Sequence, residues 1–180
     1  MKQKAISSVT LILVGNMLTT YNNIGSGWTS TITAIIGFVL FFIGLGQLNS
    51  FLDEPGQKGL SMLKNSAILG IVALIIHIIP LLGGIIAGIL YLIAFIIQLV
   101  GLLQLQKSTT LGTKGAAGIS NLLIAMGLMI IGSLIGILPF AGGTINALIS
   151  LIAFMLILLG WLKIQEGIIE NEINSDGSLT

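Results

Sequence analysis

The chain has 180 residues, of which 55% are hydrophobic and only 7% are charged. Soluble domains carry about 25% charged residues, so this composition excludes an ordinary water-soluble protein and indicates a protein embedded in a lipid bilayer. The net charge is +1, arginine is absent and the seven lysines are scattered, which argues against nucleic-acid binding. Cysteine is also absent, so disulfides, thiolate catalysis and cysteine-ligated metals are excluded.

Hydropathy along the chain predicts six membrane-spanning helices. Their expected ranges are 5–21, 29–48, 61–79, 84–105, 118–138 and 144–165. Lys2 and Lys4 precede the first apolar run, but no clean small-residue cleavage pattern follows it, so we expect this run to be a retained span. The stretch 80–105 carries no charge, and as a helix of about 1.5 Å per residue it can cross a hydrocarbon core of roughly 30 Å.

The connections between the predicted spans alternate in character, which predicts the orientation of the chain. The segments 22–28, 80–83 and 139–143 are short and uncharged, whereas 49–60 and 106–117 are longer and charged. All seven lysines therefore fall on one side of the membrane, and the positive-inside rule makes that side cytoplasmic. Six spans then place both ends in the cytoplasm, and we expect a multi-pass protein of a bacterial or archaeal cytoplasmic (inner) membrane.

Three parts of the sequence resemble one another. The runs GLGQL at 44–48, GLLQL at 101–105 and GWLKI at 160–164 are spaced by 57 and 59 residues, and the turn PLLGG at 80–84 matches PFAGG at 139–143. The chain leading into the second and third parts also matches, because Lys58-Gly59 and Asn65 correspond to Lys114-Gly115 and Asn121. Proline ends a helix and paired glycines permit a sharp reversal, so these turns predict helical hairpins.

The predicted fold is therefore an all-α polytopic membrane protein of three tandem αα-hairpin repeats. The expected hairpins are 5–48, 61–105 and 118–165, in one six-helix domain over residues 1–165. The acidic stretch 166–180 follows as a cytoplasmic tail that we expect to be disordered. A pseudo-threefold bundle is the preferred arrangement of the hairpins, and a side-by-side array is the alternative.

Small residues spaced four apart are the predicted helix-packing positions. Lipid is as apolar as leucine, so helices in a membrane associate where small residues let their backbones approach. The candidates are Gly84 with Gly88 and Gly132 with Gly136. We expect contacts within the chain at these positions, and the alternative is a contact between copies in a homo-oligomer.

A few polar side chains are predicted to lie at membrane depth. They are Asn16, His77, Gln98, Ser133, Asn146 and Ser150. Buried amides usually form hydrogen bonds between helices, so we expect that role for them, and a solute pathway is the alternative. His77 lies near the outer end of the third span, where we expect a helix-end group and hold a pH-sensing role as the alternative.

Nothing in the sequence predicts catalysis, a metal or a cofactor. No Asp or Glu lies inside a predicted span, so the paired or mid-membrane carboxylates of proton-driven machines are missing. We therefore expect a protein that is not an enzyme. Four lysines at the cytoplasmic ends set the topology and alternatively bind anionic lipid headgroups: Lys58, Lys64, Lys107 and Lys114.

The glycine-rich spans, the proline turns at 80 and 139, and the closing runs at 44–48 and 101–105 resemble those of the HdeD-type acid-resistance membrane proteins. That resemblance implies six spans in three hairpins and a small stress-related or accessory role, and it transfers no functional residue. We accordingly predict a non-enzymatic accessory protein that contacts itself, another membrane protein and membrane lipids. The alternatives are a small permease, channel or substrate-binding component for a neutral or apolar solute, and a lipid-binding protein.

Overall fold

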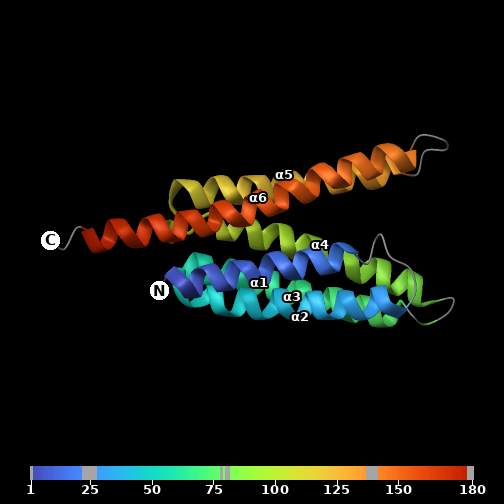
Figure 1. Cartoon of the computed structure of the whole chain (residues 1–180). Coiled ribbons are helices and arrows are strands. Elements are labelled where there is room, and N and C mark those ends of the chain that lie inside the picture. The colour runs from blue at the N-terminus through green and yellow to red at the C-terminus, as the bar shows by residue number, and fades with distance from the viewer. Residues whose placement is uncertain (1, 22–27, 78, 80–81, 137–141, 178–180) are drawn as a thin grey trace. The chain divides into compact units, whose positions relative to one another are not determined.

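The computed structural model describes residues 2–21, 28–77, 79, 82–136 and 142–177, and within these ranges the chain is all-helical (Figure 1). Six α-helices follow one another, with two short 3-10 helices between them. They are α1 (Lys2–Tyr21), α2 (Trp28–Leu48), η1 (Asn49–Phe51), α3 (Glu54–Ile76), α4 (Gly83–Leu105), η2 (Thr109–Leu111), α5 (Gly112–Gly136) and α6 (Gly142–Gly177). The predicted turn residues 22–27, 80–81 and 139–141, including Pro80 and Pro139, lie outside the described residues.

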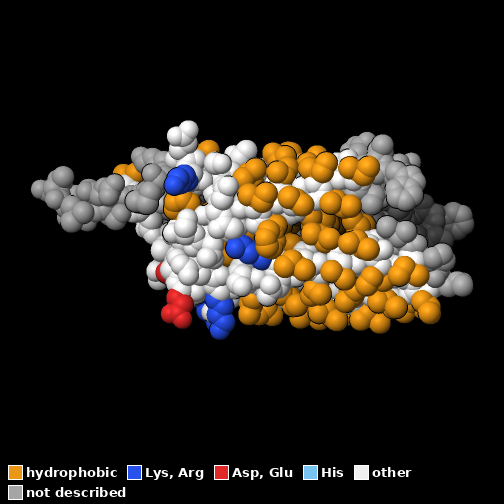
Figure 2. All heavy atoms as spheres, turned by 90° about the horizontal axis from the view of Figure 1, so that it is seen from below, with side chains coloured by type: hydrophobic (Ala, Val, Ile, Leu, Met, Phe, Trp, Pro, Cys, Tyr) orange, Lys and Arg blue, Asp and Glu red, His pale blue; other side chains and the backbone are white. Residues whose placement is uncertain are grey.

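Five stretches of the described chain are long and apolar enough to cross a membrane. They are Ile32–Phe51, Glu54–Ile76, Gly83–Leu105, Thr109–Gly136 and Gly142–Asn171. The all-α prediction is confirmed for the described residues, and the five stretches indicate an integral membrane protein. The first predicted span, 5–21, falls within α1, which is not among these five stretches. On the face in Figure 2, hydrophobic side chains are exposed along much of the helices.

Contacts divide the chain into two compact units, Met1–Thr110 and Leu111–Thr180, where the sequence predicts one domain over residues 1–165. In the first unit α1 packs on α2 and α3 packs on α4, with a smaller contact between α2 and α3. In the second unit α5 packs along α6 (Figure 1). The paired helices run antiparallel, because Gly44 near the end of α2 faces Ser8 near the start of α1.

Helices α3 and α5 begin six or seven residues before the predicted spans. Asp53 is the N-cap of α3, its carboxylate accepts the backbone N–H of Gly56, and a proline occupies the first turn, where a missing N–H costs nothing. Helix α5 begins at Gly112, whose φ of +59° is one that glycine adopts readily. Hydropathy does not predict these first turns because they are polar, yet their backbone is helical.

Helix α6 continues to Gly177, so residues 166–177 are helical where the sequence predicts a disordered tail. The reason lies in packing within the second unit. Gly167 lies against the carbonyl oxygen of Leu111 and the backbone of Gly115, and Ile168 is buried. Contacts of this kind hold a polar segment in a helix that composition alone would leave disordered.

Each helix pair is closed by small residues through which two backbones meet. A Cβ atom built on Gly59 would lie 2.7 Å from the carbonyl oxygen of Gly101, and one built on Gly118 would lie 2.5 Å from that of Gly160. A Cβ on Gly44 would lie 2.7 Å from the carbonyl oxygen of Ser8. Real Cβ atoms do not approach so closely, so any larger residue at these positions would push the helices apart.

The small residues recur seven positions along each helix. The buried set is Ser8 and Gly15 on α1, Gly37 and Gly44 on α2, Gly59 and Ser66 on α3, Ala94 and Gly101 on α4, Gly118 and Ala125 on α5, and Ala153 and Gly160 on α6. We call this set the small-residue seam. A seven-residue spacing keeps one face of a helix against its neighbour over several turns. The seam pairs Gly59 with Gly118 across the second and third pairs, where the sequence comparison matched Gly59 with Gly115, almost one helical turn away.

Candidate functional site

The predicted helix-packing glycines behave in two different ways. Within residues 1–110, no atom lies within 4 Å of a Cβ built on Gly84 or Gly88, so the expected internal contact is not formed there. Both glycines lie on the exposed face of α4, while Ala87 between them is fully buried. By contrast, a Cβ on Gly132 would lie 2.7 Å from the Oδ1 atom of Asn146, and one on Gly136 would lie 3.2 Å from its Nδ2 atom. Gly132 and Gly136 thus lie beside Asn146 in the second unit, whereas Gly84 and Gly88 have open space in the first.

The predicted polar residues are spread over the two units. In the second unit the Ser150 hydroxyl lies 3.4 Å from the Oδ1 atom of Asn146, and Ser133 is exposed and donates to the carbonyl oxygen of Met129 in its own helix. In the first unit Asn16 and Gln98 are half-buried, on α1 and α4. His77 is exposed and caps the C-terminus of α3. None of these six residues lines the hollow described below.

The polar contacts that the sequence did not predict lie at the lysine-bearing end of the first unit, around Asp53. Its Oδ1 atom accepts the hydroxyl of Ser108, and its Oδ2 atom accepts both the backbone N–H and the hydroxyl of Thr109, each at 2.8 Å. The Thr110 hydroxyl lies 2.8 Å from that of Ser108 and accepts the backbone N–H of Asp53 at 3.4 Å. Because Asp53 begins α3 and residues 108–110 follow α4, these contacts fasten the open end of the α3–α4 pair. We call them the Asp53 clasp.

The clasp makes Asp53 a stronger acid than an isolated aspartate. Partial burial raises the pKa of its carboxyl group, but the hydrogen bonds from Ser108, Thr109 and Gly56 outweigh this effect. Together they lower the pKa from 3.8 to about 2. Asp53 is therefore ionised at neutral pH, and both of its carboxylate oxygens already accept hydrogen bonds. This makes it a structural group rather than a proton carrier.

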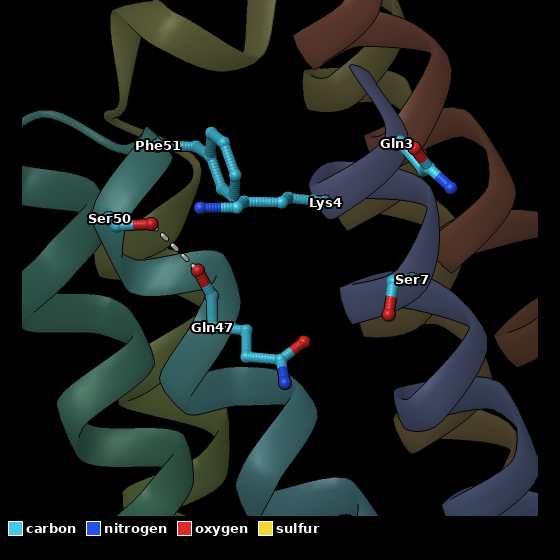
Figure 3. A pocket seen from close by; sticks show the side chains of 6 residues that line it. All are labelled: Gln3, Lys4, Ser7, Gln47, Ser50 and Phe51. Carbon is cyan, nitrogen blue, oxygen red and sulfur yellow. Dashed lines mark hydrogen bonds between the residues drawn. The ribbon is translucent and has the colours of Figure 1, made fainter. Parts of the chain in front are cut away.

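A hollow of about 560 Å³ opens beside the N-terminal end of α1 and the C-terminal end of α2 (Figure 3). Its lining residues are Gln3, Lys4, Ser7, Gln47, Ser50 and Phe51. The Lys4 side chain reaches from α1 across the hollow towards the ring of Phe51. The Ser50 hydroxyl donates to the carbonyl oxygen of Gln47 at 2.9 Å, so Ser50 is held beside the end of α2. Five of the six lining residues carry a polar side-chain group, one of these groups is the Lys4 ammonium, and none is acidic.

The four lysines predicted to contact lipid headgroups lie in the first half of α3, just after α4 and near the start of α5. Their surroundings differ. Lys58 and Lys107 are exposed. Lys64 is half-buried, and its Nζ atom lies 5.9 Å from the centre of the Phe42 ring on α2. Lys114 forms an ion pair with Glu170, with 3.5 Å between Nζ and Oε2. Two of the four therefore have partners within the chain, and two face outwards.

Among the described residues, no three His, Asp or Glu side chains gather where they could hold a metal ion. In the first unit, a cation and neutral hydrogen-bond donors lie together around the hollow at the ends of α1 and α2. No protein-family model, no curated protein and no solved structure matches this sequence. The resemblance to HdeD-type proteins stays a prediction.

Proposed function

We propose that the chain is a six-span membrane protein of three tandem helical hairpins, with both ends in the cytoplasm, and that it works as a non-enzymatic accessory protein. It would act through helix contacts with itself or with another membrane protein. The small-residue seam carries this proposal. Backbones in contact along each pair leave no room between the paired helices for a solute, whereas the outer helix faces stay free for partners.

The matching burial of the three pairs supports the repeat. Val9, Leu60 and Ile119 are each fully buried, one residue after the seam positions Ser8, Gly59 and Gly118. Leu48, Leu105 and Ile164 are also fully buried, four residues after the corresponding seam glycines of α2, α4 and α6. The six-span count includes α1, whose packing along α2 supports its placement beside the other spans.

Small permease activity is the less favoured alternative. A pathway for a polar solute needs polar side chains on facing surfaces, whereas the Ser133 and Ser150 hydroxyls each bond within their own helix. The exposed hydrophobic side chains of α4, among them Ile85, Leu92 and Ile96, face outwards as expected for contact with lipid or with a partner helix.

The orientation can be tested by single-cysteine labelling, because the natural chain contains no cysteine. Cysteines at Ser50 and Lys107 are expected to react with an impermeant maleimide only in inside-out vesicles or after lysis. A cysteine at Thr144, near the start of α6, is expected to react in intact cells. Labelling of positions 50 and 107 from opposite sides would refute the three-hairpin orientation.

The accessory role can be tested by comparing association with transport. Photo-crosslinking side chains placed at Ile85 and Leu92 are expected to yield adducts with a second copy or with another membrane protein in cells. The matched control is a crosslinker at Ala87, which is fully buried. Proteoliposomes containing the purified protein are expected to show no solute uptake above empty liposomes, and saturable uptake would favour the permease alternative.

A further inference from the structure

The hollow at the ends of α1 and α2 has the chemistry of a binding site for an anion. Five of its six lining residues offer an ammonium, amide or hydroxyl group, and none is acidic. Its volume of about 560 Å³ lies within the range of small-molecule sites, roughly 300–1,000 Å³. An anion held there would meet the charge of Lys4 and neutral donors from two helices.

The surfaces beside the hollow are apolar. On α1 the helical face that carries Ser7 continues through Val14 and Met17, which are 39% and 47% exposed. On α2 the face that carries Gln47 continues through Ile43, Val39 and Ile36, which are 43% to 49% exposed. A hollow that contains one lysine and no acid thus lies at one end of two exposed apolar stripes, one on each helix of the pair.

We propose that this hollow binds the phosphate headgroup of one anionic phospholipid, whose acyl chains lie along the apolar stripes of α1 and α2. The proposal rests on the orientation proposed above, which places Lys4 at the headgroup level of the cytoplasmic leaflet. Lys4 would supply the charge, Gln3 and Gln47 would supply hydrogen-bond donors, and Phe51 would cover the glycerol region. A free phosphate ion would satisfy the hollow but would leave the stripes uncovered.

Native mass spectrometry of the whole protein in mild detergent can measure this binding, with phosphatidylglycerol and phosphatidylcholine titrated separately. The natural chain is expected to bind one phosphatidylglycerol in preference to phosphatidylcholine. Lys4→Ala is expected to weaken that binding about five-fold, the effect of one lysine near an anionic lipid. Lys163→Ala is the control, because Lys163 does not line the hollow and is not among the four lysines considered for headgroup binding.

Three outcomes would overturn the proposal. They are an unchanged affinity in Lys4→Ala, an equal loss in Lys163→Ala, and displacement of the lipid by inorganic phosphate alone. A second variant, Ile43→Ser, tests the stripe, and it should weaken phosphatidylglycerol binding without weakening that of soluble glycerol phosphate. Circular dichroism and elution volume will show that each variant is folded.

The binding assay and the orientation assay fail independently. Because affinity is measured in detergent, it does not depend on which side of the membrane the hollow faces. Labelling of a cysteine at Ser50 from outside the cell would overturn the orientation and leave the anion site standing. A loss of lipid preference with correct labelling would overturn the site alone.

Discussion

The helix pairs α3–α4 and α5–α6 share one packing register, yet their lysine-bearing ends are fastened by different chemistry. Gly59 meets Gly101 in one pair and Gly118 meets Gly160 in the other, at positions 59 residues apart. The first pair is then fastened by the Asp53 clasp, a set of hydrogen bonds to one carboxylate. The second is fastened by the backbone approach of Gly167 to Leu111 and by the exposed Lys114–Glu170 ion pair.

This difference shows that residue size is constrained where two backbones meet, whereas the contacts at the helix ends vary between the pairs. Contact between two backbones admits almost no side chain, so the seam keeps small residues in all three pairs. At the helix ends the two pairs are held by different contacts, a carboxylate cap in one and an ion pair with a glycine contact in the other. Substitutions at three sites, taken from the largest expected effect to the smallest, can break or sharpen the contrast.

The largest effect is expected at the seam. Gly118→Ala would place a methyl group 2.5 Å from the carbonyl oxygen of Gly160, so the helices must separate, and we expect a loss of roughly 1–3 kcal/mol in the free energy of unfolding. Gly127→Ala on the same helix has open space for its Cβ and should gain roughly 0.5–1 kcal/mol, because alanine favours helix. Thermal unfolding in detergent measures both, and effects of the same sign would contradict the seam.

A smaller effect is expected at the clasp. Asp53→Asn should lower the free energy of unfolding by on the order of 1 kcal/mol at neutral pH, because the charged N-cap and its hydrogen bonds are weakened. Glu54→Gln, in the same turn and exposed, is the control. Denaturant unfolding of the three proteins gives the comparison, and equal stability of all three would show that the clasp contributes nothing.

The clasp also predicts a pH dependence. The pKa of Asp53 is about 2 in the folded chain, below its ordinary value of 3.8, so the folded state binds the proton less readily. The stabilisation is therefore complete above pH 3.8 and is lost as the pH falls towards 2. The stability difference between the natural chain and Asp53→Asn should shrink over this window. A difference that stays constant would show that the charge is not what matters.

The smallest effect is expected at the ion pair of the second unit. Lys114 and Glu170 are about half exposed, and pairs of this kind contribute roughly 0.2–1 kcal/mol. A double-mutant cycle of Lys114→Ala and Glu170→Ala should give a coupling energy in that range that falls when salt is added. A coupling above that of the clasp would reverse the ranking of the two ends.

The sequence predicted the apolar parts of the helices and missed their polar extensions. The predicted starts and ends at 48, 84 and 105 agree with the structure within one residue. Hydropathy measures transfer into lipid, so it does not predict helical turns built from polar residues, such as those before residue 61 and after residue 165. Capping signals were present there, because Asp53 and a following proline are typical of a helix start.

The seam was missed for a different reason. A search for small residues four apart on one helix finds Gly84 and Gly88, which face outwards in α4. The packing positions recur every seven residues and include serine and alanine, so they are visible only when two neighbouring helices are compared. The hollow lined by Lys4 and Phe51 could not be predicted, because it depends on how α1 and η1 meet in space.

Helix α6 is longer than the hydrocarbon core of a bilayer is thick. Its 36 residues extend roughly 54 Å at about 1.5 Å per residue, against roughly 30 Å of hydrocarbon. Since α6 is longer than the hydrocarbon core is thick, we expect its polar last turns, which carry Glu166 and Glu170, to lie outside that core. A fluorophore attached near Asn174, in the last turns of α6, is therefore expected to report a tilt or rotation of this helix.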